Sequence, residues 1–203
     1  GVGVGTDLGR EQIRKFVEQR VSSQVNGTIH IGKVSGGLFT RFTLDTFAIR
    51  GPDDSILVST GRIRLDYNPR DLADLRVYLK NVEVEHPVVR LRQHPEGDWN
   101  FQRIFKDDGP STPGLPGRSL GDYVVLDSVT VHDGTFLLTR PWEPDDTLSG
   151  AKRDSAIRVN IANPNREIRR TAEGLAHTYR WSEINGFLPR VRLADPDSNQ
   201  FGQ

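Results

Sequence analysis

Apolar and polar residues alternate along much of the chain, which is the pattern of strands that bury one face. The clearest case is the segment 62–67, where Ile63, Leu65 and Tyr67 alternate with charged residues. Similar short segments recur between residues 27 and 105 and again further along, including one strand expected at Ile157, Val159 and Ile161. Because no helical spacers suited to crossover connections separate them, the pattern predicts a mainly β fold with antiparallel pairing.

Residues 6–25 have a different period and predict an N-terminal amphipathic helix. The apolar positions recur at helical spacing, so they form one stripe along the helix. The stripe comprises Ile13, Phe16, Val17, Val21 and Val25. Two roles fit this helix packing face: it packs on the sheet, or it lies at a membrane surface with help from the basic residues of the same helix.

Two stretches, 47 positions apart, read as copies of one another. The aligned apolar positions are Leu79, Val82, Val84 and Leu91 in the first copy and Leu126, Val129, Val131 and Leu138 in the second. Each copy is interpreted as a strand, a short break at Pro87 or Gly134, and a second strand, which together resemble a hairpin. A repeated unit without catalytic groups indicates a scaffold.

Two slips in the alternation predict local irregularities. Phe42 and Leu44 have the opposite parity to Phe47 and Ile49, which indicates either a bulge or a strand that is apolar on both faces. A second slip falls near Asn81.

Composition suggests how the chain is divided. Residues 1–5 read as the end of a membrane anchor or signal, or as a flexible leader of small residues. Residues 6–106 hold the helix and the first β unit. Residues 107–121 are rich in Pro and Gly and predict a long loop. Residues 122–203 form a second β unit, which we assign to the same domain.

Charge and cysteine content exclude several functions. The 203 residues include no cysteine, which excludes disulfides and thiolate chemistry. The 27 basic residues balance 27 acidic ones, and the chain offers few aromatics to interleave with its strand arginines, so no nucleic-acid partner is expected. Those arginines form a solvated outer face, or a docking surface for anionic lipid headgroups or a partner protein. They are Arg62, Arg64, Arg76, Arg90 and Arg92.

No motif for catalysis or metal binding is apparent. The histidines lack ligand spacing and are interpreted as loop or surface residues, and the paired aspartates lie in turn-rich segments without a calcium-loop pattern. No nucleophile elbow or phosphate-binding loop occurs. The chain is therefore not expected to be an enzyme, and no catalytic, cofactor-binding or metal-binding residue is assigned. An enzyme would need a pocket in which groups from separate strands converge.

The N-terminal half resembles AsmA/TamB-type proteins of the bacterial envelope. These proteins have an anchor, a Thr-x-x-Gly helix and a glycine-punctuated strand pair. The matching positions are Thr6, Gly9, Gly27, Ile29, Ile31, Gly32, Val34 and Gly36. A second similarity is to a recurring unit of strand, Pro-Val, strand and acidic-Gly-Trp-Asn. Its matching positions are Pro87, Val88, Gly97, Trp99 and Asn100.

The resemblance implies an elongated antiparallel sheet curled into a groove. It also implies a place on the periplasmic side of the bacterial inner membrane, through an anchor upstream of residue 1, and a role in moving phospholipid or in outer-membrane assembly. The partners would be a membrane surface or phospholipid, and other subunits of a membrane complex. A structural accessory subunit docked on a large respiratory or photosynthetic complex is the alternative.

A sheet with one apolar face must cover that face. The positions expected on it are Ile29, Ile31, Phe42, Leu44, Ile63, Leu65, Val77, Leu79, Val89 and Leu91. They line an apolar groove suited to acyl chains, or they form the closed core of a sandwich.

Overall fold

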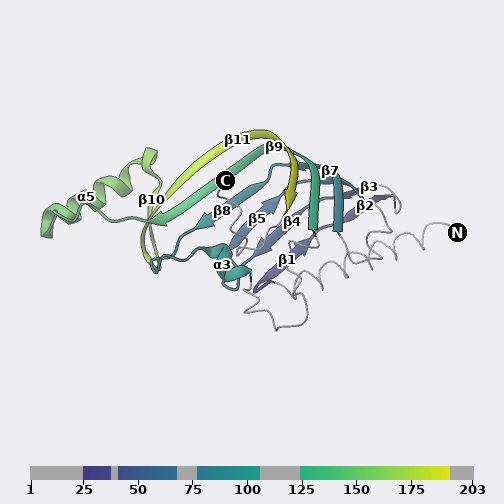
Figure 1. Ribbon diagram of the computed structural model, residues 1–203. Coiled ribbons are helices and arrows are strands. Elements are labelled where there is room, and N and C mark those ends of the chain that lie inside the picture. Colours follow the sequence, from purple (N-terminus) through teal and green to yellow (C-terminus); the bar gives the residue numbers. More distant parts are fainter. Residues whose placement is uncertain (1–24, 38–40, 68–76, 106–123, 193–203) are drawn as a thin grey trace, which may run out of the picture.

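The computed structural model describes residues 25–37, 41–67, 77–105 and 124–192, and these form one 11-stranded sheet (Figure 1). The mainly β class predicted from the alternation is confirmed. The predicted loop 107–121 and the predicted helix, apart from Val25, lie outside the described residues. The strands are β1 (Thr28–Ile31), β2 (Val34–Gly37), β3 (Arg41–Leu44), β4 (Phe47–Arg50), β5 (Ile56–Thr60), β6 (Ile63–Tyr67), β7 (Val77–Glu85), β8 (Val88–Arg92), β9 (Val124–Pro141), β10 (Ile168–Thr171) and β11 (Gly174–Arg192).

Consecutive strands join end to end into long rows that lie side by side. β1 continues into β2, β3 into β4, β5 into β6, and β7 into β8, whereas β9 and β11 each fill a row alone. Neighbouring rows pair along both of their halves: for example, β3 pairs with β6 while β4 pairs with β5. Both β units therefore contribute to a single sheet.

The two sequence copies lie next to each other in register. β9 pairs in parallel with both β7 and β8, and every partner is 47 positions away. Leu79 lies beside Leu126, and Leu91 lies beside Leu138. The expected antiparallel pairing holds for the other pairs of strands but not for these. A parallel neighbour requires a long connection, and residues 93–123 between β8 and β9 supply it.

The copies are not hairpins. β9 runs without interruption through Gly134, and β7 and β8 lie along it as one strand with a bend at Pro87. The breaks in the sequence pattern are bulges, at which a residue adopts a left-handed backbone conformation. Asn81 and Ser128 form one such pair in neighbouring rows, with φ of 48° and 57°. The slip predicted near Asn81 is thus confirmed as an irregularity of the strand.

The second pair of bulges falls where the rows bend. His86 and Asp133, with φ of 48° and 52°, are 47 positions apart, and the His86 Nδ1 lies 3.0 Å from the Asp133 carboxylate. Each bulge shifts the alternation by one residue. Val131 and Phe136 consequently remain on the same face despite opposite parity. The bend between Leu44 and Phe47, where β3 ends and β4 begins, has the same effect. Both residues pack on one apolar cluster, so the parity shift there is a break between two strands and not a strand that is apolar on both faces.

Glycines let neighbouring rows approach closely along the bend. The Gly61 N–H donates to the Glu85 carbonyl at 2.9 Å, and a Cβ on Gly61 would lie 2.9 Å from the same oxygen. At Gly32 a Cβ would lie 2.4 Å from the Thr46 Oγ1. Side chains at these two positions would push the rows apart, so the bend depends on glycine.

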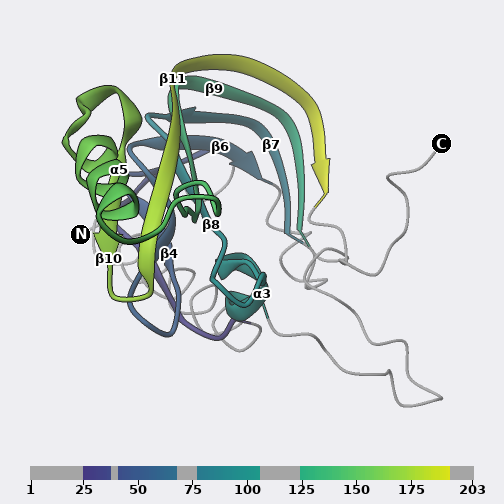
Figure 2. The same ribbon diagram turned by 90° about the vertical axis from the view of Figure 1, so that its left-hand side faces the viewer.

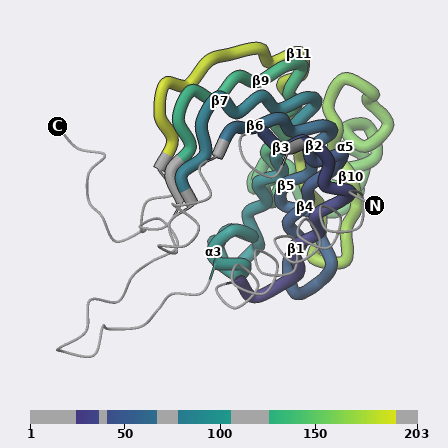
Figure 3. The backbone as a smooth tube through the Cα atoms, turned by 90° about the vertical axis from the view of Figure 1, so that its right-hand side faces the viewer, coloured from purple at the N-terminus to yellow at the C-terminus, as the bar shows by residue number. Residues whose placement is uncertain are grey.

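The sheet curves strongly, and β6, β7, β9 and β11 arch over the side on which the short helix α3 (Asn100–Ile104) lies (Figures 2 and 3). We call this concave side the inner face. It carries two apolar clusters, one in each half of the rows. One is built on Phe42, Ile63, Leu65, Val82 and Val129, and the other on Val25, Leu57 and Ile104.

One strand expected from the sequence is a helix instead. Ile157, Val159 and Ile161 suggested a strand, but they lie in α5 (Gly150–Ala162), which is followed by a 3-10 turn, η1 (Pro164–Arg166). Three alternating apolar residues are too short a pattern to decide between strand and helix, and the preceding polar residues favour a helix. α5 buries none of its residues and projects away from the sheet (Figure 1).

Substitution of Ile104 by alanine should destabilise the protein strongly. Ile104 is 1 % exposed and joins α3 to Val25 and Leu57. Removing its side chain leaves a cavity, so we expect a loss of about 2–5 kcal/mol in the free energy of unfolding. Ile161→Ala is the matched control, because Ile161 is 38 % exposed on α5 and should change stability by at most about 0.5 kcal/mol. Denaturant titration of both variants measures the difference, and equal midpoints would contradict the assigned core.

Gly61→Ala should weaken the bend of the sheet. The added methyl group meets the Glu85 carbonyl oxygen, and the shift needed to relieve the contact should cost about 1–3 kcal/mol. Gly186→Ala is the control, since a Cβ at Gly186 meets nothing within 4 Å. In thermal unfolding, the midpoint temperature of Gly61→Ala should lie clearly below that of the parent protein, and the midpoint of Gly186→Ala should lie close to it.

Candidate functional site: the inner face and the open edge

The inner face gathers the apolar positions expected from the sequence. Ile31, Phe42, Ile63 and Leu65 are buried there. The half-buried members are Ile29, Leu44, Leu79, Val89 and Leu91, and Val77 lies in β7 opposite Val124. From the helix packing face, only Val25 is among the described residues; it is 3 % exposed and packs against Leu57 and Ile104.

The apolar inner face continues beyond these positions onto β9 and β11. In β9 it adds Phe136 and Leu138 beside Val89 and Leu91. In β11 it adds Tyr179 and Trp181. The face thus crosses from β1 to the last strand. No β11 residue was expected on this face, although Tyr179 and Trp181 alternate with polar neighbours in the sequence.

Exposure of the inner face rises sharply at β11. Val129 in β9 is 5 % exposed, whereas Leu188, its partner in β11, is 49 % exposed. Tyr179 is 44 % and Trp181 is 48 % exposed. Isolated exposed apolar residues are ordinary, but a contiguous group on one strand indicates a surface that contacts something.

The exposed group includes a short aromatic ladder. Along β11, ring centroids of His177 and Tyr179 are 4.1 Å apart, and those of Tyr179 and Trp181 are 6.3 Å apart. Phe136 on β9 continues the ladder, 5.5 Å from Trp181. Such contacts hold the rings in place and leave a rigid apolar surface with polar tips.

The opposite, outer face carries charges that are paired across strands. Arg64 contacts Glu83 and Glu85 at 3.1 and 3.0 Å, and Arg62 contacts Glu85 at 3.8 Å. Two further arginines from the sequence analysis are also engaged: Arg92 with Glu173 at 2.9 Å, and Arg90 with the Ser59 hydroxyl. Arg76 lies outside the described residues. The arginines therefore do not form a purely basic surface.

Two carboxylates on this face are held in the charged form by arginines. Arg41 and Asn81 donate to Asp66, which lowers the pKa of Asp66. Arg180 on β11 donates two hydrogen bonds to Glu167, just before β10, and lowers the pKa of Glu167 below its ordinary value. The second pair ties the start of β11 to the segment that precedes β10.

A buried histidine, which sequence reasoning missed, fixes the turn between β10 and β11. His94 is only 4 % exposed, and its Nδ1 lies 3.1 Å from the Glu173 carboxylate, which also accepts from Arg92. His94 follows β8 in a turn, where Gly97 has a φ of 98°. Glu173 is distant in the sequence, so only the fold shows that the two meet. The cluster anchors the β10–β11 turn to β8.

Potential metal ligands do not cluster in the part of the chain that the structure describes. No group of three or more His, Asp or Glu side chains there is placed to hold a metal ion. Asp53 and Asp145 instead accept hydrogen bonds from Ser55 and Thr147 in local turns. Among the same residues, no helix has the length and apolarity needed to cross a membrane.

Comparison of the chain with protein-family models, with curated proteins and with solved structures gives no match.

The Glu167–Arg180 pair should make the stability of the folded protein depend on pH in the acid range. Because the pKa of Glu167 is lowered in the folded state, the pair stabilises the fold above the ordinary glutamate pKa and loses this effect as the pH falls through the lowered value. We expect the free energy of unfolding to decrease below about pH 5. Glu167→Gln should decrease less over the same range, and chemical denaturation at several pH values measures both. Identical pH profiles would contradict this role.

Proposed function

We propose that this chain is a non-enzymatic, membrane-proximal β-rich scaffold of AsmA/TamB type that handles lipid in the bacterial cell envelope. The observation that carries the proposal is the apolar inner face, which extends across every row of the curved sheet and ends in exposed side chains on β11. A concave apolar surface is complementary to acyl chains. No arrangement for catalysis is needed for such a role.

The exposed part of the inner face has an energetic cost in water. Full burial of one large apolar side chain stabilises by about 1.5–3 kcal/mol relative to full exposure. Tyr179, Trp181 and Leu188 each leave nearly half of their surface in contact with solvent. An acyl chain lying along β9 and β11 would cover these side chains and gain part of that energy.

The family assignment rests on the resemblance in the sequence, and the structure gives its glycines a physical role. Gly27 and Gly32 lie where a Cβ would meet the backbone of Arg50 or the Thr46 hydroxyl, and Gly36 has a φ of 107°. Trp99 and Asn100 begin α3. Positions that a curved sheet of this kind requires therefore coincide with the positions of the resemblance. A site on the periplasmic side of the inner membrane, with an anchor upstream of residue 1, is part of the same proposal.

Trp181 can report lipid binding directly. A variant that keeps only Trp181, with Trp99 and Trp142 replaced by phenylalanine, should lose fluorescence when mixed with phospholipid that carries bromine on its acyl chains. Bromine quenches at short range, so contact with the acyl chain is needed. A variant that keeps only Trp142 is the control, because Trp142 lies beyond the end of β9 and belongs to no strand of the sheet. The expected result is strong quenching of Trp181 and weak quenching of Trp142.

Equal quenching of both tryptophans would indicate nonspecific adsorption, and no quenching of either would reject lipid binding by the inner face. The purified protein should also carry phospholipid that can be extracted and identified. Its absence from protein purified without detergent would count against the proposal.

An accessory subunit of a large membrane complex is a second candidate, favoured by α5. This helix buries none of its residues, and Val159 is 65 % exposed on it. A helix that buries none of its own residues is suited to packing on another protein. Native gel electrophoresis of gently solubilised membranes distinguishes the candidates, since migration as a free monomer would exclude the subunit role.

A further inference from the structure

The inner face changes from apolar to basic at the end of β8, β9 and β11 that lies nearest α5 (Figure 1). Three successive rows of side chains that run across these strands show the change. Toward that end, the rows are Val89, Phe136 and Trp181; then Leu91, Leu138 and Tyr179; then Gln93, Arg140 and His177. Of these three rows, only the last carries basic groups. The apolar surface therefore ends directly beside an arginine.

Hydrogen bonds hold Arg140 in place but use only one of its nitrogens. The Gln93 Nε2 donates to the Gly97 carbonyl at 3.1 Å, and the Gln93 Oε1 accepts from the Arg140 Nε at 3.0 Å. In the part of the chain that the structure describes, no carboxylate forms an ion pair with Arg140, and the donors of its two terminal nitrogens have no acceptor. A guanidinium presents these donors as a planar fork that matches the oxygens of a phosphate. Arg140 is thus oriented in advance for an anion.

The neighbours of Arg140 favour an anionic ligand as well. Its partner in β11 is His177, whose ring centroid lies 4.1 Å from that of Tyr179, so this histidine is held beside the arginine. Glu167 interacts electrostatically with His177, but its carboxylate is already bound by two hydrogen bonds from Arg180. An arginine and a histidine side by side at the end of an apolar surface are complementary to a ligand with an anionic group and an apolar tail.

The side chains around the aromatic ladder favour an acyl chain over other apolar ligands. Aromatic rings also stack against sugars, but a sugar needs polar side chains beside the rings to bind its hydroxyl groups. Here the neighbours of Trp181 and Tyr179 in β9 are Phe136 and Leu138, and the next neighbours in β8 are also apolar. This part of the surface is therefore complementary to an acyl chain.

We infer that the inner face binds one phospholipid molecule with its phosphate at Arg140 and an acyl chain along Phe136 and Trp181. The inference rests on the proposed function, and it adds the class of lipid and its direction on the sheet. Arg140 donates to the phosphate oxygens beside His177, and Gln93 is a positioning residue that sets the angle of the guanidinium. The acyl chain covers rings that are half-exposed to water, which stabilises the complex.

Two soluble lipids with the same acyl chain separate the effect of the phosphate from that of the chain. The variant that keeps only Trp181 is titrated with a lysophosphatidylglycerol and with a monoacylglycerol. Both carry the same brominated chain, and both are kept below the concentration at which they form micelles. Quenching should show saturable binding of both lipids, with the phosphate-containing lipid bound about tenfold more tightly, which corresponds to about 1.4 kcal/mol. Glycerol phosphate, which has no acyl chain, should compete only in large excess.

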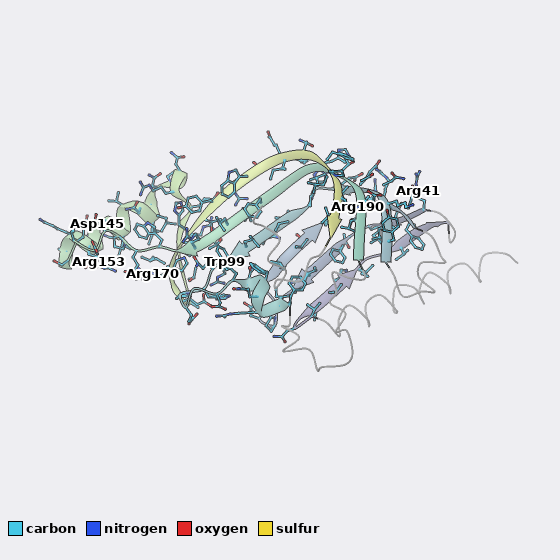
Figure 4. The ribbon with its side chains drawn as sticks, viewed as in Figure 1. Arg41, Trp99, Asp145, Arg153, Arg170 and Arg190 are labelled. Atoms are coloured by element: carbon cyan, nitrogen blue, oxygen red, sulfur yellow. The ribbon has the colours of Figure 1, made fainter. Side chains whose placement is uncertain are left out.

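Substitutions in the last row assign the phosphate to Arg140. Arg140→Gln should weaken binding of lysophosphatidylglycerol about tenfold, so that the two lipids bind with similar affinity. Gln93→Glu keeps the shape of the side chain but places a carboxylate against Arg140, and should also remove the difference. Arg190→Gln is the control for loss of one positive charge, because Figure 4 shows Arg190 at the opposite end of the sheet from Trp99, which pairs with Gln93. This control should bind both lipids as the parent does, and circular dichroism confirms that each variant is folded.

Several results would overturn the inference. If the two lipids bind equally, or if Arg140→Gln leaves their difference intact, the phosphate does not lie at Arg140, although the proposed function still stands. Glycerol phosphate that competes as well as the whole lipid would exclude a part for the apolar surface. A fatty acid with the same brominated chain that binds as tightly as the phospholipid would contradict selection of a phosphate. Absence of quenching by either lipid would overturn both the inference and the proposed function.

Discussion

The pairing of two similar sequence segments in parallel and in register is the interaction on which the rest of the sheet depends. Because every partner of β9 in β7 and β8 is 47 positions away, like side chains lie beside like. The bulges at Asn81 and His86 also lie beside those at Ser128 and Asp133. Two rows that bend at the same places can remain hydrogen-bonded through the bend. If only one row bent, the hydrogen-bond ladder would break.

The matched bulges also explain why the sheet has one apolar face. A bulge reverses the alternation of side chains, and the sequence reverses its own alternation at the same places. Val131 and Phe136 therefore share a face, as do Leu44 and Phe47. The outer face collects the charges instead, and pairs such as Arg64 with Glu83 satisfy them across strands. Curvature then turns the apolar face inward, and among the described strands the exposed large apolar side chains lie on β11.

Several of these features follow from the sequence. The repeat gave the correct register of neighbouring rows, since Leu79 and Leu126 aligned in the sequence are also partners in the sheet. The parity slips did mark irregularities: a left-handed residue at Asn81 and a break between β3 and β4 after Leu44. The antiparallel direction expected for all strand pairs was wrong for β9 with β7 and β8, because a repeat contains no information about which way the second copy runs. The strand predicted at Ile157 was wrong because a brief alternation within a polar segment has no packing partner to enforce it.

The sequence by itself determined which residues lie on the inner face and where each row bends, because side-chain alternation and backbone conformation are local properties. Only the tertiary structure decided which rows meet, that β9 runs parallel to β7 and β8, and that β11 leaves apolar side chains exposed. Those outcomes depend on contacts between residues far apart in the chain. The contact between the buried His94 and Glu173 also depends on residues far apart in the chain. No pattern in the sequence around either residue predicts the contact, and the fold alone brings them together.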